Sequence, residues 1–303
     1  MFRPLYVLII SFILMSYVHA LDYSLGTDYF FAFKKDRVFL DSYYSTNSSA
    51  SFHDIGIQNA SLLYSEGAGA MFVNAFPTDN NTISFQFGYG YMDLNFRQNP
   101  SFNQKAFNDA VFSVGYITTS VEDWRIVFNM GIHSNVDHFS FSNNSFYTGM
   151  IWGRLTYSTP VGVHIGFLGQ SGLKSTYLFP ILGVDFYLSR QWKINAVFPL
   201  DFSVQYYINE NWSSGLNYRS FGGWYRSFHR VGSGEPNPYS MFSLNANGAD
   251  LSLAFQKKMV SLEVFAGANF GGWIEIRDKN GDNSEYYPFN YSGFVGGKAS
   301  LDF

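Results

Sequence analysis

The sequence has no cysteine and little charge, and each shortage excludes a class of protein. Only 14% of its 303 residues are charged, about half the usual share in soluble domains. An exported eukaryotic chain of this size would carry disulfides, and a bacterial lipoprotein would need a cysteine at its cleavage site. The mean hydropathy of −0.06 is too low for a helical membrane protein. These shortages together favour a bacterial protein whose surface is not built mainly for water.

Other absences narrow the function. The net charge of −4 gives no electrostatic reason to expect nucleic acid as a partner. No glycine-rich phosphate loop is present, and no apolar run of about 18 residues follows the first 20. Aromatic residues make up 20% of the chain, and 28 residues are glycine.

The N-terminus has the order of a secretory signal peptide. Arg3 supplies a positive charge, Leu5 to Met15 is apolar, and Ala20 ends a small-x-small pattern. A membrane anchor would need about 20 apolar residues, so this run is too short. We expect residues 1–20 to be a signal peptide cleaved after Ala20, and the chain to be exported in a Gram-negative bacterium.

Beyond the signal, apolar and polar residues alternate. In Phe289 to Phe303 one face carries aromatic, aliphatic and glycine residues, and the other is mostly polar. Such strands reach 10 to 15 residues, whereas a typical soluble strand has about 5 or 6 and a membrane-crossing strand about 9 to 11. After Tyr91, Met92 and Leu94 shift the phase, which predicts a β-bulge. Alternation also covers 83–91, 124–133, 147–157, 251–255 and 260–268.

Short and long connections take turns along the chain, as in outer-membrane barrels. The pattern predicts an all-β fold, a transmembrane antiparallel up-and-down β-barrel of about 12 strands (range 10 to 14) over residues 66–303. Residues 21–65 form an N-terminal segment with a possible first strand; within it, Asp41 to Ser51 fits a loop, a periplasmic extension or a plug.

Pro199 splits Lys193 to Ile208 into two pieces that are short for a membrane crossing. Short turns are expected near 77–81, 121–123, 159–162, 189–191, 209–211 and 257–258, and long loops near 97–105, 138–145, 226–238 and 278–288.

Three tryptophans each follow a short polar turn: Trp124, Trp192 and Trp212. A ring that enters a strand from the short-turn side suits an interfacial girdle, because its apolar body meets lipid and its N–H stays near the headgroups. Core tryptophans of a soluble sandwich are the alternative.

Phe303 ends an alternating aromatic strand, and this resembles the assembly signal of bacterial outer-membrane β-barrel proteins. The resemblance implies that Phe303, Leu301, Ala299 and Tyr291 are recognised by the barrel-assembly machinery, and that outer-membrane lipid surrounds the barrel. About 25 residues starting with Phe179–Pro180–Ile181 are similar to an uncharacterised group of such barrels. That second resemblance implies no activity.

No catalytic, cofactor or metal site stands out, and we expect the protein not to be an enzyme. His138 and Ser140 have the spacing of an outer-membrane lipid hydrolase, but they fall in an expected loop. Asp137 beside His138 similarly resembles part of an outer-membrane protease. The oxygen-rich run Asp278 to Glu285 lacks calcium-loop spacing. The other histidines of the exported chain are His53, His133, His164 and His229.

The charged residues expected to face the lumen are of mixed sign, whereas a strongly selective pore has one dominant charge ring. The main hypothesis is therefore a passive channel or small-solute transporter of the outer membrane. The alternatives are a non-conducting structural or surface-interaction barrel, which uses the loops near His229 and Asp278, and an outer-membrane lipid hydrolase. The lumen candidates are Arg125, Arg154, Arg219, Glu263 and Lys298, with Lys193 and Asp302 beside them.

Overall fold

A computed structural model describes residues 38–53, 59–98, 105–136, 141, 144–158, 160–173, 175–227, 240–278 and 283–303. Within these ranges, no helix has the length and apolar character needed to cross a membrane. The expected signal peptide, the cleavage after Ala20 and the residues Asp137, His138, Ser140 and His229 lie outside the described residues.

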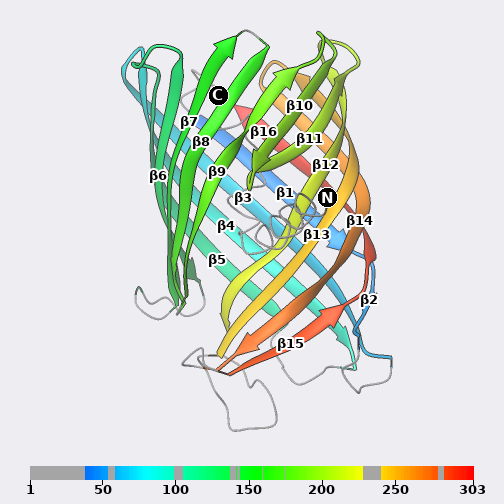
Figure 1. Ribbon diagram of the computed structural model, residues 1–303. Coiled ribbons are helices and arrows are strands. Elements are labelled where there is room, and N and C mark those ends of the chain that lie inside the picture. The colour runs from blue at the N-terminus through cyan, green and yellow to red at the C-terminus, as the bar shows by residue number, and fades with distance from the viewer. Residues whose placement is uncertain are drawn as a thin grey trace, which may run out of the picture.

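The described chain consists of antiparallel strands, and from β3 to β14 each strand pairs with the next one along the chain (Figure 1). The alternating runs form strands because successive side chains of an extended backbone point to opposite faces. The strands are β1 (Val38–Asn47), β2 (Ala50–Ser51), β3 (Ser61–Thr78), β4 (Asn81–Arg97), β5 (Ala106–Thr118), β6 (Trp124–Asn135), β7 (Ser145–Ser158), β8 (Val161–Gly172), β9 (Ser175–Tyr187), β10 (Trp192–Phe198), β11 (Asp201–Tyr207), β12 (Trp212–Ser227), β13 (Ser240–Lys257), β14 (Val260–Arg277), β15 (Ser284–Phe289) and β16 (Ser292–Asp302).

The sheet closes on itself at β1. One edge of β1 pairs with β16, from Phe39 opposite Asp302 to Asn47 opposite Phe294. The other edge pairs with β3, from Val38 opposite Val73 onwards. The expected barrel is confirmed. The division at residues 65 and 66 falls inside β3, and β1 lies within the segment 21–65.

The barrel has 14 strands, more than the expected number of about 12. β2 continues β1, and β15 continues β16 along β14, so neither adds a strand to the count. The sequence leaves two segments ambiguous as strands: Lys193 to Ile208 and the run that begins at Asp41. β10 and β11 have only 7 residues each on either side of Pro199, yet each pairs on both sides. β1 contains the Ser- and Tyr-rich run that begins at Asp41 and also fits a loop.

All the expected short turns lie at one end of the barrel, which we call the short-turn end and which is uppermost in Figure 1. The backbone N–H of Asp302 donates to the carbonyl oxygen of Met259 in the β13–β14 turn, 2.9 Å away, so β16 finishes at this end. The opposite end, which we call the loop end, carries the connections after β4, β6, β12 and β14. The β8–β9 connection is also at the loop end and is short, since β8 ends at Gly172 and β9 begins at Ser175.

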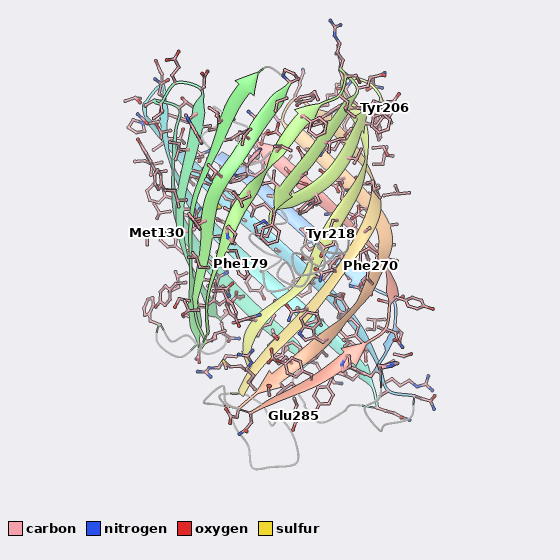
Figure 2. All side chains as sticks on the ribbon, in the orientation of Figure 1. Met130, Phe179, Tyr206, Tyr218, Phe270 and Glu285 are labelled. Carbon is pink, nitrogen blue, oxygen red and sulfur yellow. The ribbon has the colours of Figure 1, made fainter. Side chains whose placement is uncertain are left out.

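The two faces of the wall differ in composition, as the alternation predicts. On β6, Phe128 and Met130 point outward and are 42% and 75% exposed, whereas Val127 and His133 point inward and are buried. Large apolar residues cover the outer face of the other strands in the same way (Figure 2). An apolar band of this kind is the surface that a barrel presents to hydrocarbon.

The prediction of a β-bulge after Tyr91 is wrong. β4 keeps a continuous register with β3 from Ser61 opposite Arg97 to Ala75 opposite Ile83. Met92 and Leu94 therefore stay on the inner face, where they are 0% and 1% exposed. The change of residue type reflects an apolar interior at the loop end, not a change of phase.

We expect Leu94→Ala to lower the free energy of unfolding by about 2–5 kcal/mol, the usual cost of truncating a buried leucine. Leu251→Ala on β13 is the control and should cost less, because Leu251 is 67% exposed on the outer face. Urea unfolding of the reconstituted barrel, followed by tryptophan fluorescence, measures both. Equal losses would indicate that Leu94 faces lipid.

Candidate functional site: the barrel lumen

The expected lumen residues all lie on the inner face, and three of them form one charged cluster. The guanidinium of Arg219 on β12 donates from Nε to Oδ2 of Asp250 at 2.5 Å and from Nη2 to Oε1 of Glu263 at 2.5 Å. Its central carbon lies 3.8 Å from the ring centroid of Phe265. Lys298 is directly opposite Glu263 in the β14–β16 register. Two cations and two carboxylates thus balance in one patch.

A second cluster surrounds Asp185 on β9. Arg154 on β7 binds both carboxylate oxygens of Asp185, with Nε at 2.6 Å and Nη2 at 2.7 Å. Nε2 of His164 on β8 lies 2.5 Å from Oδ1 of the same carboxylate. Trp152 Nε1 donates to His164 Nδ1 at 3.2 Å, which leaves the proton of a neutral imidazole on Nε2, facing Asp185.

Arg154 reaches Asp185 across the strand between them because Gly162 on β8 has no side chain. A Cβ at Gly162 would collide with the Asp185 carboxylate and the Arg154 guanidinium. Arg125, another expected lumen residue, is directly opposite Arg154 on β6. Asp185, Asp250, His164 and Gly162 also lie on the inner face, although they are not among the lumen residues expected from the sequence. Asp185 could have been found from the sequence, because it is a charged residue in the run beginning at Phe179 that is similar to other barrels.

The inner face near these clusters is not fully enclosed. The side chains of Arg154 and Glu263 keep 22% and 23% of their surface accessible although they point into the barrel. Arg125 and Lys298 are likewise only half-buried. These polar side chains of the short-turn half therefore keep contact with solvent, and we call the inner face that they line the polar chamber.

The loop half of the lumen is narrowed by an apolar cluster that joins opposite walls. Phe107 on β5 stacks on Phe242 of β13 with ring centroids 4.7 Å apart, and its centroid lies 4.9 Å from that of Tyr225 on β12. Glu66 on β3 also bridges the walls, since its carboxylate accepts from the backbone N–H of Gly222 on β12 at 2.8 Å. Tyr43 Oη donates to the same carboxylate at 2.9 Å. We call this region the constriction.

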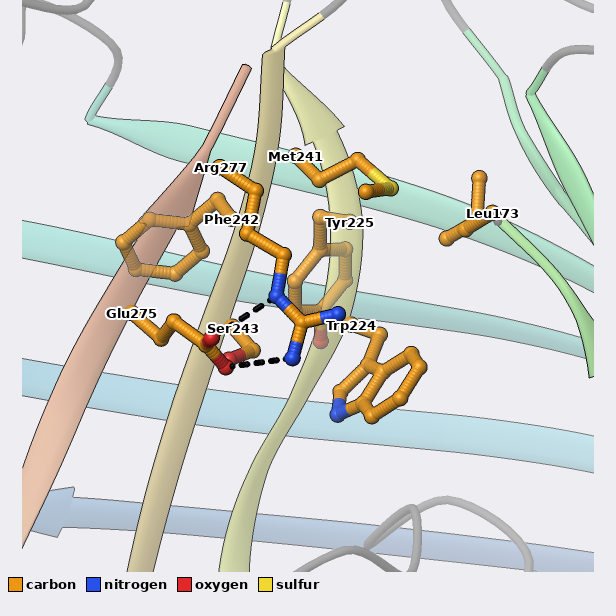
Figure 3. Close-up of a pocket in the computed structure, with 8 residues that line it drawn as sticks. All are labelled: Leu173, Trp224, Tyr225, Met241, Phe242, Ser243, Glu275 and Arg277. Carbon is orange, nitrogen blue, oxygen red and sulfur yellow. Dashed lines mark hydrogen bonds and ion pairs between the residues drawn. The ribbon is translucent and has the colours of Figure 1, made fainter. Parts of the chain in front are cut away.

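A small, partly open pocket lies beside the constriction toward the loop end (Figure 3). Its wall is mostly apolar, with Trp224 and Leu173 among the lining residues, and it contains one ion pair. In that pair Arg277 Nε donates to Glu275 Oε1 at 2.7 Å and Nη2 to Oε2 at 3.1 Å. The Arg277 guanidinium carbon lies 6.0 Å from the Trp224 ring.

The three girdle tryptophans lie at the strand starts next to the short turns. Trp192 and Trp212 are on the outer face, 43% and 40% exposed. Trp192 packs on Tyr206 at 4.8 Å and Trp212 on Phe255 at 5.0 Å between ring centroids. Trp124 covers Gly153 of the neighbouring strand. Their contact with lipid headgroups stays a prediction.

The residues of the expected assembly signal are on the outer face of the closing seam. Tyr291 is 79% exposed, Phe303 57% and Leu301 40%. Leu301 lies opposite both Leu40 of β1 and Val260 of β14. Their recognition by an assembly machinery stays a prediction.

The remaining candidates do not assemble into a site within the described residues. His133 is buried on the inner face, stacked on Phe146 with ring centroids 4.3 Å apart, and Nδ1 lies 3.7 Å from Asp109 Oδ2. In the oxygen-rich run, Asn283 Nδ2 donates to Asp278 Oδ2 at 2.7 Å. No group of three His, Cys, Asp or Glu with metal-binding geometry occurs in the part of the chain that the structure describes.

The fold is similar to that of a solved outer-membrane protein, the COG4313 outer membrane channel from Pseudomonas putida F1. The TM-score is 0.50 with 9% identity, and the match covers 88% of this chain and 96% of that one. At this identity the likeness shows the fold. The resemblance to outer-membrane β-barrel proteins is thereby confirmed.

No family model matches the sequence. It is 24% identical over 210 residues to an uncharacterized protein of Chlamydia pneumoniae, covering 65% of this chain and 61% of that protein. It is also 24% identical over 207 residues to an uncharacterized protein of Chlamydia muridarum, covering 67% and 64%. The chain thus spans less than two thirds of the length of these relatives.

We expect Asp185→Ala to lower the free energy of unfolding by about 3 kcal/mol, because it leaves a half-buried guanidinium without its carboxylate. Arg154→Ala/Asp185→Ala should recover part of that loss. Chemical unfolding of the single and double variants gives the coupling energy. A coupling near zero would show that the ion pair does not stabilise the barrel.

Proposed function

We propose that this protein is an outer-membrane channel through which small solutes pass without an energy source. The observation that carries the proposal is the polar chamber, where Arg154 and Glu263 point inward and keep contact with solvent. The apolar outer face supports a membrane location, because it matches hydrocarbon and not water. The fold likeness to a solved outer-membrane channel agrees with both parts.

The mixed charge of the chamber favours a weakly selective channel. Arg219 is balanced by Asp250 and Glu263, and Arg154 by Asp185. Pores that strongly prefer one sign of ion carry a dominant ring of the other sign. The charge of the solute is therefore not the main criterion for passage.

A non-conducting structural or surface-interaction barrel is the second candidate, and the constriction is the observation that favours it. Phe107 and Phe242 meet across the barrel and narrow the passage. Planar-bilayer recording of the refolded protein separates the two functions. Discrete conductance steps support the channel, and their absence at every voltage would support the structural barrel.

We expect Phe107→Ala/Phe242→Ala to raise the single-channel conductance several-fold, because two rings that narrow the lumen are removed. Phe112→Ala on β5 is the matched control, since Phe112 is 41% exposed on the outer face. It should leave conductance unchanged. If the double variant conducts like the original protein, ions do not pass through the constriction.

We expect Glu263→Gln to shift the ion preference toward anions and Lys298→Gln to shift it toward cations. Both side chains lie on the inner face, and a fixed charge acts over the Debye length of about 10 Å at 0.1 M salt but only about 3 Å at 1 M. Reversal potentials in a salt gradient measure the preference. Shifts of the same sign, or shifts that do not shrink at high salt, would contradict an ion path past these residues.

A further inference from the structure

The strands that carry the charged side chains of the polar chamber lie on two opposite sides of the barrel. The ring has 14 strands, and β6 is seven strands away from β13 in either direction around it. The same count separates β7 from β14. β6 and β7 therefore face β13 and β14 across the lumen, on the left and the right of Figure 1.

The inner face of β6 to β10 has an excess of positive charge in the short-turn half. Arg125 and Arg154 lie directly opposite each other on β6 and β7. Lys193 on β10 shares the inner face with Asn195, and the two are 5% and 2% exposed. Asp185, which Arg154 binds, is the carboxylate of this side. With histidine counted as neutral, three cations and one carboxylate give a net charge of +2, and we call this side the basic wall.

The inner face of β11 to β14, β16 and β1 has an excess of negative charge. The cluster around Arg219 contains two cations and two carboxylates. Three further carboxylates occupy inner positions of the same side. Asp41 on β1 accepts from Ser300 Oγ at 3.1 Å, Asp302 on β16 is 9% exposed, and Asp201 on β11 is half-buried. Five carboxylates and two cations give a net charge of −3, and we call this side the acidic wall.

Uncharged residues separate the two walls on both sides of the lumen. The structure describes all of β3, β4 and β5, and in their short-turn half the inner face carries no charged residue. Ser113 Oγ of β5 donates there to Gln86 Oε1 of β4 at 2.8 Å. On the other side, Asn195 Nδ2 of β10 donates to Ser203 Oγ of β11 at 2.9 Å. The charges of mixed sign are thus sorted by wall and not interspersed around the ring.

This arrangement acts differently on ions and on solutes that carry both charges. A cation is attracted by the acidic wall and repelled by the basic wall, and an anion experiences the reverse. The effects on a single ion therefore largely cancel, because the two walls nearly balance. A solute with a cationic and an anionic group is attracted at both ends when it lies across the lumen. Fixed charges act over about 10 Å at 0.1 M salt, so the effect is confined to the chamber.

We propose that the polar chamber conducts small zwitterions, which cross it with the cationic group toward the acidic wall and the anionic group toward the basic wall. The proposal rests on the channel function and names its substrate class. An uncharged polar lumen would treat a zwitterion and an uncharged solute of the same size alike. A solute with one ammonium group, one carboxylate and a short carbon chain between them matches both walls.

The first test measures the potential at each wall and leaves every charge in place. The chain has no cysteine, so Thr156→Cys on β7 and Ser261→Cys on β14 each introduce a single thiol. Thr156 is exposed and accepts from Arg154 Nη1 at 3.1 Å, and Ser261 is a half-buried residue of the acidic wall. Each thiol in the reconstituted barrel reacts with an anionic methanethiosulfonate (2-sulfonatoethyl) or a cationic one (2-trimethylammonioethyl). Mass spectrometry gives the two rates.

The ratio of the anionic to the cationic rate should be at least several-fold higher at position 156 than at position 261. Comparing the two positions cancels the intrinsic reactivities of the two reagents. The difference should be largest at about 0.01 M salt, where the Debye length is about 30 Å, and should shrink at about 1 M, where it is about 3 Å. Equal ratios would show that the charges are not separated, and no reaction at either position would show that the walls do not face solvent. Either result would overturn the proposal.

The second test compares two solutes of equal size at low salt. Liposomes that contain the barrel swell as 4-aminobutanoic acid, a zwitterion, or 4-hydroxybutanamide, which is uncharged, enters them. The zwitterion should enter several-fold faster, and equal entry would contradict the proposal.

The double variant Arg125→Gln/Lys193→Gln should bring the ratio of the two entry rates close to one, because it removes the net charge of the basic wall. Arg190→Gln/Lys258→Gln is the matched control, since it removes two exposed positive charges from the short turns. It should keep the original ratio. An equal loss in both double variants would assign the preference to the overall charge and not to the walls.

The conductance recordings keep the two proposals separable. Discrete conductance steps together with equal reagent ratios at positions 156 and 261 would retain the channel and reject the zwitterion selectivity. Separated ratios without conductance and without swelling would retain the two charged walls but reject passage, and with it both proposals.

Discussion

The closure of the sheet at β1 is the constraint on which the rest of the structure depends. In hydrocarbon, backbone N–H and C=O groups must bond to one another, so a membrane sheet has to return to its first strand. β1 meets this need because it pairs with β16 on one edge and β3 on the other. Closure also fixes which side chains face inward, since the alternation along each strand then separates lumen from lipid.

The interior is divided into two halves of different chemistry. In the short-turn half, the next strand supplies the carboxylate that holds Arg219, and the next but one supplies the carboxylate that holds Arg154, which compensates charge removed from bulk water. In the loop half, Phe107 and Phe242 join opposite walls. The short β10–β11 hairpin adds the third element, because its pairing with β9 and β12 ends at Phe198 and Ser203 and does not reach the loop end.

Much of the fold and part of the lumen could be predicted from the sequence. The phase of β6 and β16 placed Arg125 and Lys298 on the inner face, since a period of two leaves only two choices. The bulge expected after Tyr91 was wrong because apolar residues were assigned to lipid, whereas Met92 and Leu94 pack inside. Alternation identifies the two faces of a strand, but it cannot say whether an inner face meets water or another wall.

The sequence by itself determined a strand-built barrel, an apolar outer face and a mixed-charge lumen, because these depend on side-chain order along single strands. Only the tertiary structure decided the 14-strand count, the pairing of Arg154 with Asp185 across Gly162 and the constriction. It also decided how far the β10–β11 hairpin pairs along β9 and β12. Each of these depends on which strands become neighbours and how far along their length they pair. The order of residues within one strand does not specify its pairing partners or the extent of the pairing.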